Sequence, residues 1–218
     1  MARSKKNLYF KPVRCLPAWK WALLSLLFLL LIPANLFQRG GHWIELVKRA
    51  EGKAAYEILK VYSILKSNRS NMSEASAWAI TETILEESKK HSLDPMLVLA
   101  VIKVESRFHE SAISTEGARG LMQIRPFVAN ALAEEVELTK WEGESSLDDP
   151  ILNIKLGVFY LSHLKKRFRD LKLALAAYNW GPTEIRSRLE GEEEVPLGYA
   201  MKVLSAYYVY RSDSRQTN

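Results

Sequence analysis

The sequence lacks the features that define several common protein classes. Its 218 residues include one cysteine, Cys15, so no disulfide framework holds the chain together. It also lacks a phosphate-binding glycine loop and the Ser-His-Asp order of hydrolases. None of the four histidines has a metal-ligand spacing: His42, His91, His109 and His163. The sequence therefore predicts no metal and no cofactor, and a fold that depends on its apolar core.

Net charge is missing from most of the chain. The sequence carries 31 basic and 25 acidic residues, a formal net charge of +6. Residues 1–20 hold six of the basic residues and no acid, so the remainder has 25 charges of each sign. A neutral body has no electrostatic reason to bind nucleic acid, so no such partner is predicted. The excess charge belongs to a basic tail.

Residues 21–37 contain no charge and directly follow that tail. A basic flank before an apolar run is typical of an export signal or a membrane anchor, with the basic end in the cytoplasm. The most apolar part, residues 22–32, is 11 residues long, as in signal peptides, whereas all 17 residues reach the lower limit for a bilayer span. The residues before Ala34 make a poor cleavage pattern, which favours a retained anchor. Both alternatives export the rest of the chain.

The segment 38–71 is predicted to be an amphipathic helix beside the membrane. Apolar residues recur at helical spacing from 42 to 65: Trp43, Val47, Ala50, Ala54, Ile58, Val61 and Leu65. This stripe is short for a coiled coil, which favours a helix docked on the domain that follows. The alternative is a stalk or an association surface, through which residues 42–65 would contact a protein of the cell-envelope machinery.

Residues 72–212 lack the alternating, Val-rich runs of β-strands, and helical patterns fill most of this region. We expect helices at 74–91, 95–105, 126–135, 149–169, 170–179, 182–190 and 197–211. Asp94 and Pro95 are typical of a helix start. The sequence thus predicts an all-α domain with one irregular insertion at 106–125, which forms a small hairpin at most, and a tail at 213–218.

Glu105 breaks the pattern of the helix that it ends. Residues 95–104 are apolar almost all round, which indicates a buried helix. A carboxyl group at the edge of a core has its charged form disfavoured, so its pKa rises, as a general acid near neutral pH requires. The alternative is that Glu105 pairs with an arginine or faces water. The local pattern does not decide between the two.

Four motifs follow in order along the chain. They are ESRFHESAISTEGARGLMQIRP at 105–126, LDDPILNIKLGVFYLSHL at 147–164, ALAAYNWGP at 174–182 and YAMKVLSAYYVY at 199–210. Together they resemble lytic transglycosylases of the soluble-lytic-transglycosylase (SLT) type, enzymes that cut bacterial peptidoglycan. The resemblance covers roughly 78–210 and implies a lysozyme-like (goose-type), mostly helical catalytic domain with a groove for a glycan strand. The chain departs from the family pattern at Phe127, Val128 and Trp180, which leaves its substrate preference open.

The resemblance implies that Glu105 is both acid and base. It would protonate the glycosidic oxygen and then take the proton of the muramic C6 hydroxyl, which closes a 1,6-anhydro ring on C1 with help from the N-acetyl group. Most glycosidases instead use two carboxylates, and substrate assistance is the exception. Glu110 and Glu116 are the nearby candidates for a second carboxylate, but both lie in a polar turn segment.

The resemblance also implies a set of substrate-binding residues: Ser106, Ser114, Met122, Gln123, Tyr178, Asn179 and Tyr199. Ser106 would bond the muramic sugar, and Tyr178 would hold Glu105 or the substrate. Met122 would touch the glycan face, or else belong to the core, and the two tyrosines could be packing residues. We therefore expect a periplasmic lytic transglycosylase anchored in the inner membrane, acting on the MurNAc-β-1,4-GlcNAc bond. The alternatives are a hydrolytic lysozyme of the same fold and a glycan-binding assembly factor.

Overall fold

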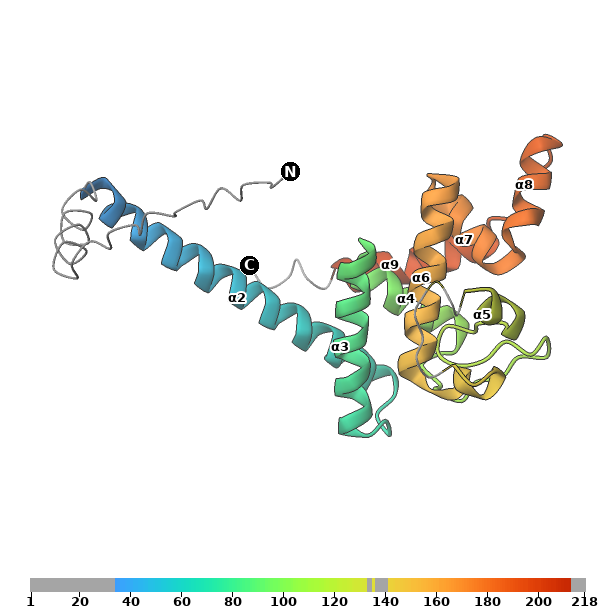
Figure 1. Cartoon of the computed structure of the whole chain (residues 1–218), viewed down its shortest axis with the longest axis horizontal. Helices are drawn as coiled ribbons and strands as arrows, with labels where there is room; N and C mark the ends of the chain where they lie inside the picture. Colours follow the sequence, from blue (N-terminus) through green and yellow to red (C-terminus); the bar gives the residue numbers. More distant parts are fainter. Residues whose placement is uncertain (1–33, 133–134, 136–140, 213–218) are drawn as a thin grey trace, which may run out of the picture. The chain divides into compact units, whose positions relative to one another are not determined.

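The computed structural model describes residues 34–132, 135 and 141–212, with side chains described from residue 51 onward. The chain divides into two units, residues 1–53 and 54–218. The described part of the first unit is helical. The elements, in order, are α2 (Ala34–Asn68), α3 (Glu74–His91), α4 (Pro95–Glu105), α5 (Pro126–Leu132), the 3-10 helix η1 (Glu144–Asp148), α6 (Pro150–Phe168), α7 (Leu171–Trp180), α8 (Pro182–Glu190) and α9 (Gly198–Ser212) (Figure 1).

The predicted all-α fold is confirmed within the described ranges. The insertion at 106–125 forms no strand there and no regular hairpin. Its backbone makes two isolated antiparallel bridges, which pair Arg119 with Ile113 and with Ile124. The predicted helix at 126–135 ends at Leu132, and residues 133–134 lie outside the described ranges.

Several helices begin where a side chain satisfies the free backbone N–H groups of the first turn. The capping residues are Ser73, Asp94, Asp149 and Asp170, each of which accepts a hydrogen bond from a first-turn N–H. Proline follows Asp94 and Asp149 at the first helical position, where its missing N–H costs nothing. These local signals explain why α3 and α4 have the predicted bounds.

Helix α4 runs through the core of the second unit. All seven residues from Met96 to Ile102 are buried. The helix contacts α3 and α9, while α6 contacts α3 and α7 (Figure 1). Full burial of an aliphatic side chain stabilises a fold by about 1.5–3 kcal/mol, so α4 is held firmly along its length. Its last residue, Glu105, is consequently fixed at the edge of the core.

The predicted helix at 42–65 is the middle of the longer α2. Its C-terminal turns dock on the domain, because Val61 and Leu65 are fully buried in the main core. Earlier on the same helix, Ile58 is 37% exposed and Leu59 is 59% exposed. Among the stripe residues whose side chains are described, burial is thus greatest at the C-terminal end of the helix.

The predicted membrane anchor at 21–37 lies almost entirely outside the described residues. Only its last four residues fall in the described part of the chain, as the start of α2. Within the described ranges, no helix combines the length and the apolar character needed to cross a bilayer. The basic tail at 1–20 and the tail at 213–218 also lie outside these ranges.

Candidate active site

Glu105 is the last residue of α4 and lies where the core opens to solvent. Loss of solvation raises the pKa of its carboxyl group to about 7, and a hydrogen bond from Tyr199 opposes this rise. The Tyr199 hydroxyl, on α9, donates to Glu105 Oε1 at 2.5 Å. The group is therefore about half protonated at neutral pH. A carboxyl group in this state can give a proton and then accept one.

A second tyrosine lies beside the first. The rings of Tyr178, on α7, and Tyr199 stack with their centroids 6.4 Å apart and an interplanar angle of 8°. Burial raises the pKa of both hydroxyls well above the ordinary value, and the charge of Glu105 adds to the effect. Both remain protonated and act as donors at physiological pH. Tyr178 donates to the Met122 carbonyl at 2.9 Å rather than to Glu105.

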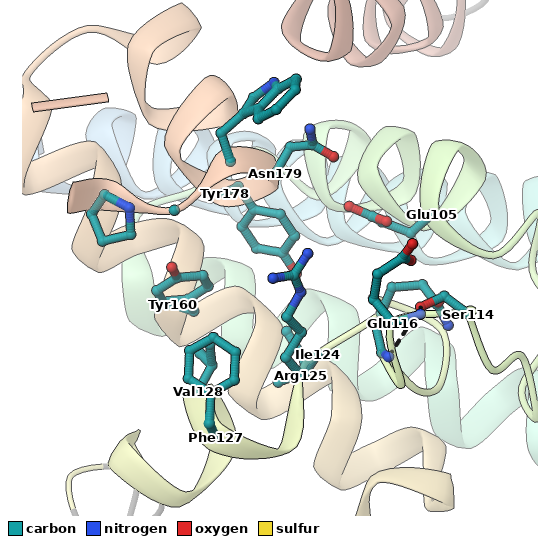
Figure 2. A pocket seen from close by; sticks show the side chains of 15 residues that line it. Glu105, Ser114, Glu116, Ile124, Arg125, Phe127, Val128, Tyr160, Tyr178 and Asn179 are labelled. Atoms are coloured by element: carbon teal, nitrogen blue, oxygen red, sulfur yellow. Dashed lines mark hydrogen bonds between the residues drawn. The ribbon is translucent and has the colours of Figure 1, made fainter. Parts of the chain in front are cut away.

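Three hollows meet at Glu105. The first, called the cleft below, holds about 250 Å³, and its lining includes Glu105, Ser114, Gln123, Tyr160, Tyr178 and Asn179 (Figure 2). The second is lined by Glu105, Asn179, Trp180, Pro196, Tyr199 and Lys202, among others. The third passes Glu105, Ser106, Arg107, His109, Ser114 and Gln123. The acid therefore borders open space on several sides.

The chain reverses sharply after Glu105. Arg107 and Phe108 both have positive φ, at 52° and 64°, which is uncommon for residues other than glycine. Phe108 is fully buried, so its packing offsets the strain of this conformation. The reversal carries the segment 109–125 back past the carboxyl group.

The turn that follows is built by Ser114. Its hydroxyl accepts hydrogen bonds from the N–H groups of Glu116 and Ala118 at 3.2 and 3.1 Å. Gly117 adopts a φ of 76°, and a Cβ there would meet no atom within 4 Å. Its role is therefore conformational rather than steric. Ser114 lines the cleft while it supports this turn.

The side chain of Asn153 holds the next turn, at Arg119 to Met122, in place. This fully buried side chain of α6 accepts from Met122 N–H at 2.8 Å and donates to the carbonyls of Arg119 and Leu147 at 2.8 and 3.1 Å. Gly120 has a φ of 77°, and a Cβ there would lie 2.2 Å from the Asn153 amide nitrogen. Glycine is thus required both for the backbone angle and for the close approach.

Met122 does not lie where the sequence predicted. Its side chain is fully buried and packs against Gly157 of α6, so it does not face the cleft. It belongs to the core, which was the alternative considered. Its backbone is held at both of its peptide groups, by Asn153 at the N–H and by Tyr178 at the carbonyl. Met122 therefore contributes by fixing the adjoining Gln123.

Gln123 lines the cleft but is also tied to the protein. Its side-chain amide donates to the carbonyls of Ala112 and Gly120 at 3.0 and 2.9 Å, and its φ is 48°. The carbonyl oxygen of the side chain remains as an acceptor. Ser106 is 7% exposed and donates to the Ile102 carbonyl at 3.1 Å, so its hydroxyl caps α4. It borders the third hollow.

The two other candidate acids, Glu110 and Glu116, lie in different surroundings. Glu110 accepts a hydrogen bond from the Ser76 hydroxyl at 3.0 Å and is absent from the linings of the three hollows. Glu116 lines the cleft with Glu105. A hydrogen bond from Thr115 is the main cause that lowers the pKa of Glu116. Glu116 is therefore ionised at neutral pH, where Glu105 is about half protonated.

Sequence reasoning assigned no role to several residues of this region. Asn153 could have been found from its position, because it is a polar residue on the apolar face of a predicted helix. Tyr160 and Arg125 offered no such signal, since only the folded chain brings them to the cleft. Phe127 and Trp180 also line it, 66% and 52% exposed.

The chain is similar to known proteins of one family. The family model described as Transglycosylase SLT domain matches residues 82–196. The soluble lytic murein transglycosylase of Salmonella typhimurium is 27% identical over 155 residues, which cover 63% of this chain and 24% of that protein. The transglycosylase of Enterobacteria phage PRD1 is 35% identical over 113 residues, which cover 52% of this chain and 38% of the phage protein.

A solved structure gives a similar result. An inactive mutant of lytic transglycosylase Slt from Pseudomonas aeruginosa superposes with a TM-score of 0.55 at 28% identity. The match covers 63% of this chain and 24% of that one. The chain thus spans about a quarter of the length of the soluble bacterial proteins that it matches.

Proposed function

Because the chain belongs to the Transglycosylase SLT domain family, we propose that it cleaves peptidoglycan as a lytic transglycosylase. The observation that carries the proposal is the state of Glu105. This carboxyl group lies at the junction of three hollows, and its pKa is raised to about 7. An acid of that strength is matched to proton transfer near neutral pH.

The reaction uses Glu105 twice. The protonated carboxyl group first gives its proton to the glycosidic oxygen as the bond from that oxygen to C1 of N-acetylmuramic acid breaks. The N-acetyl carbonyl oxygen of the same sugar stabilises C1, as in substrate-assisted glycosidases. The Glu105 carboxylate then takes the proton of the C6 hydroxyl, and that oxygen bonds to C1. The acid is restored, the 1,6-anhydro ring closes and no water is consumed.

Tyr199 adjusts this cycle. Its hydroxyl donates to Glu105 Oε1 and so favours the carboxylate. Burial alone would hold the proton too tightly for easy release at neutral pH. The hydrogen bond partly offsets burial, and the same contact fixes the orientation of the carboxyl group for both proton transfers.

The lining of the cleft supports a glycan as the substrate. Gln123 and Asn179 supply polar groups there, while Phe127 and Trp180 are large, exposed apolar side chains. Exposed aromatic surface in a groove marks a ligand site, and a glycan presents both polar edges and apolar ring faces. Ser106, Ser114, Tyr178 and Tyr199 support the loops and the acid around them.

A second candidate is hydrolysis on the same fold. Glu116 is ionised and lines the cleft with Glu105, so a water activated by Glu116 would release reducing ends instead. A glycan-binding assembly factor is the third alternative. It would not need the proton-transfer capacity of Glu105.

We further propose that the protein acts in the periplasm with residues 21–37 as its anchor in the inner membrane. The catalytic domain would span 72–212. The exposed apolar residues of α2, including Ile58 and Leu59, would be available to an envelope protein. Membrane fractionation of cells that express the whole chain, with and without residues 21–37, tests the anchor. Release of the shortened chain into the soluble fraction is expected.

The catalytic assignment is tested by release of soluble fragments from purified sacculi. We expect the full chain to release them and Glu105→Gln to release none. Glu110→Gln is the matched control, because Glu110 is an acid of the segment that follows Glu105 and lies outside the three hollows. Activity retained by Glu105→Gln would refute the proposal. Loss of activity in Glu116→Gln as well as Glu105→Gln would support the hydrolytic alternative.

A further inference from the structure

Arg125 is a cation in the cleft that the proposed reaction does not use. It directly precedes α5, and its carbonyl accepts hydrogen bonds from the N–H groups of Val128 and Ala129, both at 3.0 Å. The backbone that carries the side chain is therefore fixed. The residue is exposed, and its guanidinium group lines the cleft together with Glu105 and Tyr178 (Figure 2).

The guanidinium charge is not neutralised by a close acid. Among the described residues, no ion pair joins Arg125 to a carboxylate. Its charge contributes least among the causes that lower the pKa of Glu116, behind the hydrogen bonds that Glu116 receives. By contrast, Arg119 on the same loop forms ion pairs with Asp148 at 2.6 Å and Glu144 at 3.1 Å. Arg125 thus retains donors for an anion that enters the cleft.

We propose that Arg125 binds a carboxylate of the peptidoglycan strand close to the bond that Glu105 cleaves. This inference rests on the proposed function. Muramic acid carries a lactyl group whose carboxylate is free where the peptide stem has been removed. Where the stem is present, that group is an amide and the stem supplies its own carboxylates. A guanidinium group binds either kind of carboxylate through two parallel hydrogen bonds.

The test compares three strands: stem-bearing strands, stem-free strands with a free lactyl carboxylate, and stem-bearing strands whose carboxylates have been converted to methylamides. The full chain, Arg125→Ala and Arg125→Lys are assayed on each for kcat/KM. Arg186→Ala is the control, because Arg186 is an exposed arginine on α8 whose guanidinium lies 4.0 Å from Glu190, and it does not line the cleft.

We expect Arg125→Ala to lose about tenfold in kcat/KM on one of the carboxylate-bearing strands. On the methylamide strand its kcat/KM should stay close to that of the full chain. A loss on stem-bearing strands assigns the contact to the stem, and a loss on stem-free strands assigns it to the lactyl group. Arg125→Lys keeps the positive charge but lacks the paired donors of the guanidinium group, so it should restore part of the loss. An equal loss on all three strands, or no loss on any, overturns the inference.

The two proposals fail in different ways. Suppose that the full chain cleaves the strands, and that Arg125→Ala loses activity equally on all three strands or on none. Only the carboxylate site is then refuted. If the full chain cleaves none of them, calorimetric binding of the same three strands to Glu105→Gln decides the matter. The double variant that also carries Arg125→Ala should then bind carboxylate-bearing strands about tenfold more weakly. Equal binding by both variants would refute the site.

Discussion

Replacement of Tyr199 by phenylalanine removes one hydroxyl group from the site. That hydroxyl donates to Glu105 Oε1 at 2.5 Å and favours the carboxylate, while burial favours the neutral acid. With the bond in place, the pKa of Glu105 is about 7. Loss of the bond leaves burial unopposed, so the pKa must rise further. A hydrogen bond to a charged group contributes about 1.5–3 kcal/mol, which corresponds to a rise of about one pH unit or more.

The assay is the pH dependence of kcat/KM for release of fragments from sacculi. The reaction begins with the protonated acid, so the rate of the native chain should fall about tenfold per pH unit above pH 7. In Tyr199→Phe, the fall should begin about one pH unit higher. At pH values between these two falls, Glu105 is still mostly protonated in the variant but mostly ionised in the native chain.

The matched control is Tyr207→Phe on the same helix. The Tyr207 hydroxyl also donates to a carboxylate, Asp94 Oδ2 at 2.8 Å, but neither residue lines the three hollows. This change should leave the basic limb where the native chain has it. A limb that stays in place in Tyr199→Phe, or that moves to lower pH, would refute the electrostatic reasoning.

Three further predictions concern stability, each measured by urea unfolding. Glu105→Gln should stabilise the fold by up to about 3 kcal/mol at pH 8 and by little at pH 4. The reason is that a raised carboxyl pKa lowers the stability of the native chain as pH rises from about 4.5 to about 7. No gain in stability at pH 8 would contradict this prediction. Asn153→Ala should destabilise by about 3 kcal/mol or more, since two buried backbone groups and one part-buried carbonyl lose their partner. A cost below about 1 kcal/mol would show that water replaces the amide. Gly157→Ala should cost about 1–3 kcal/mol, because the added Cβ would lie 2.4 Å from Met122 Sδ. Met122→Ala in the same chain should recover part of that cost, and simple additivity of the two changes would count against the contact.

The helices could be predicted because their signals are local. Ser73 and Asp94 cap α3 and α4, and both helices have the predicted bounds. The apolar run of α4 also predicted its burial, and so placed Glu105 at the edge of the core. A capping residue and a periodic face act within a few residues of sequence, which is the range that pattern reasoning covers.

The rest of the site depends on contacts between distant segments. Arg119 donates to both carboxylate oxygens of Asp148, 29 residues later, at 2.9 and 2.6 Å, and so ties the loop to η1. The short η1 has no periodicity that would have revealed it. The bond from Tyr199 to Glu105 spans 94 residues. No local pattern could indicate that this tyrosine, rather than Tyr178, reaches the acid.

Met122 shows the limit of reasoning from a motif. The family resemblance implied that Met122 touches the glycan, with the core as the alternative, and its side chain is buried against Gly157. The motif located the turn correctly but not the direction of the side chain. That direction is set by α6, because Asn153 fixes the Met122 N–H and Gly157 makes room for the thioether.

The central claim is that Glu105 cleaves the strand without water, and the end groups of the products test it most directly. Sacculi are digested by the full chain in oxygen-labelled water, and the released muropeptides are weighed by mass spectrometry. The account predicts ends lighter than reducing ends by one water, free of label and absent with Glu105→Gln. Labelled reducing ends would contradict it and would identify the protein as a hydrolase, with Glu116 as the residue to examine next.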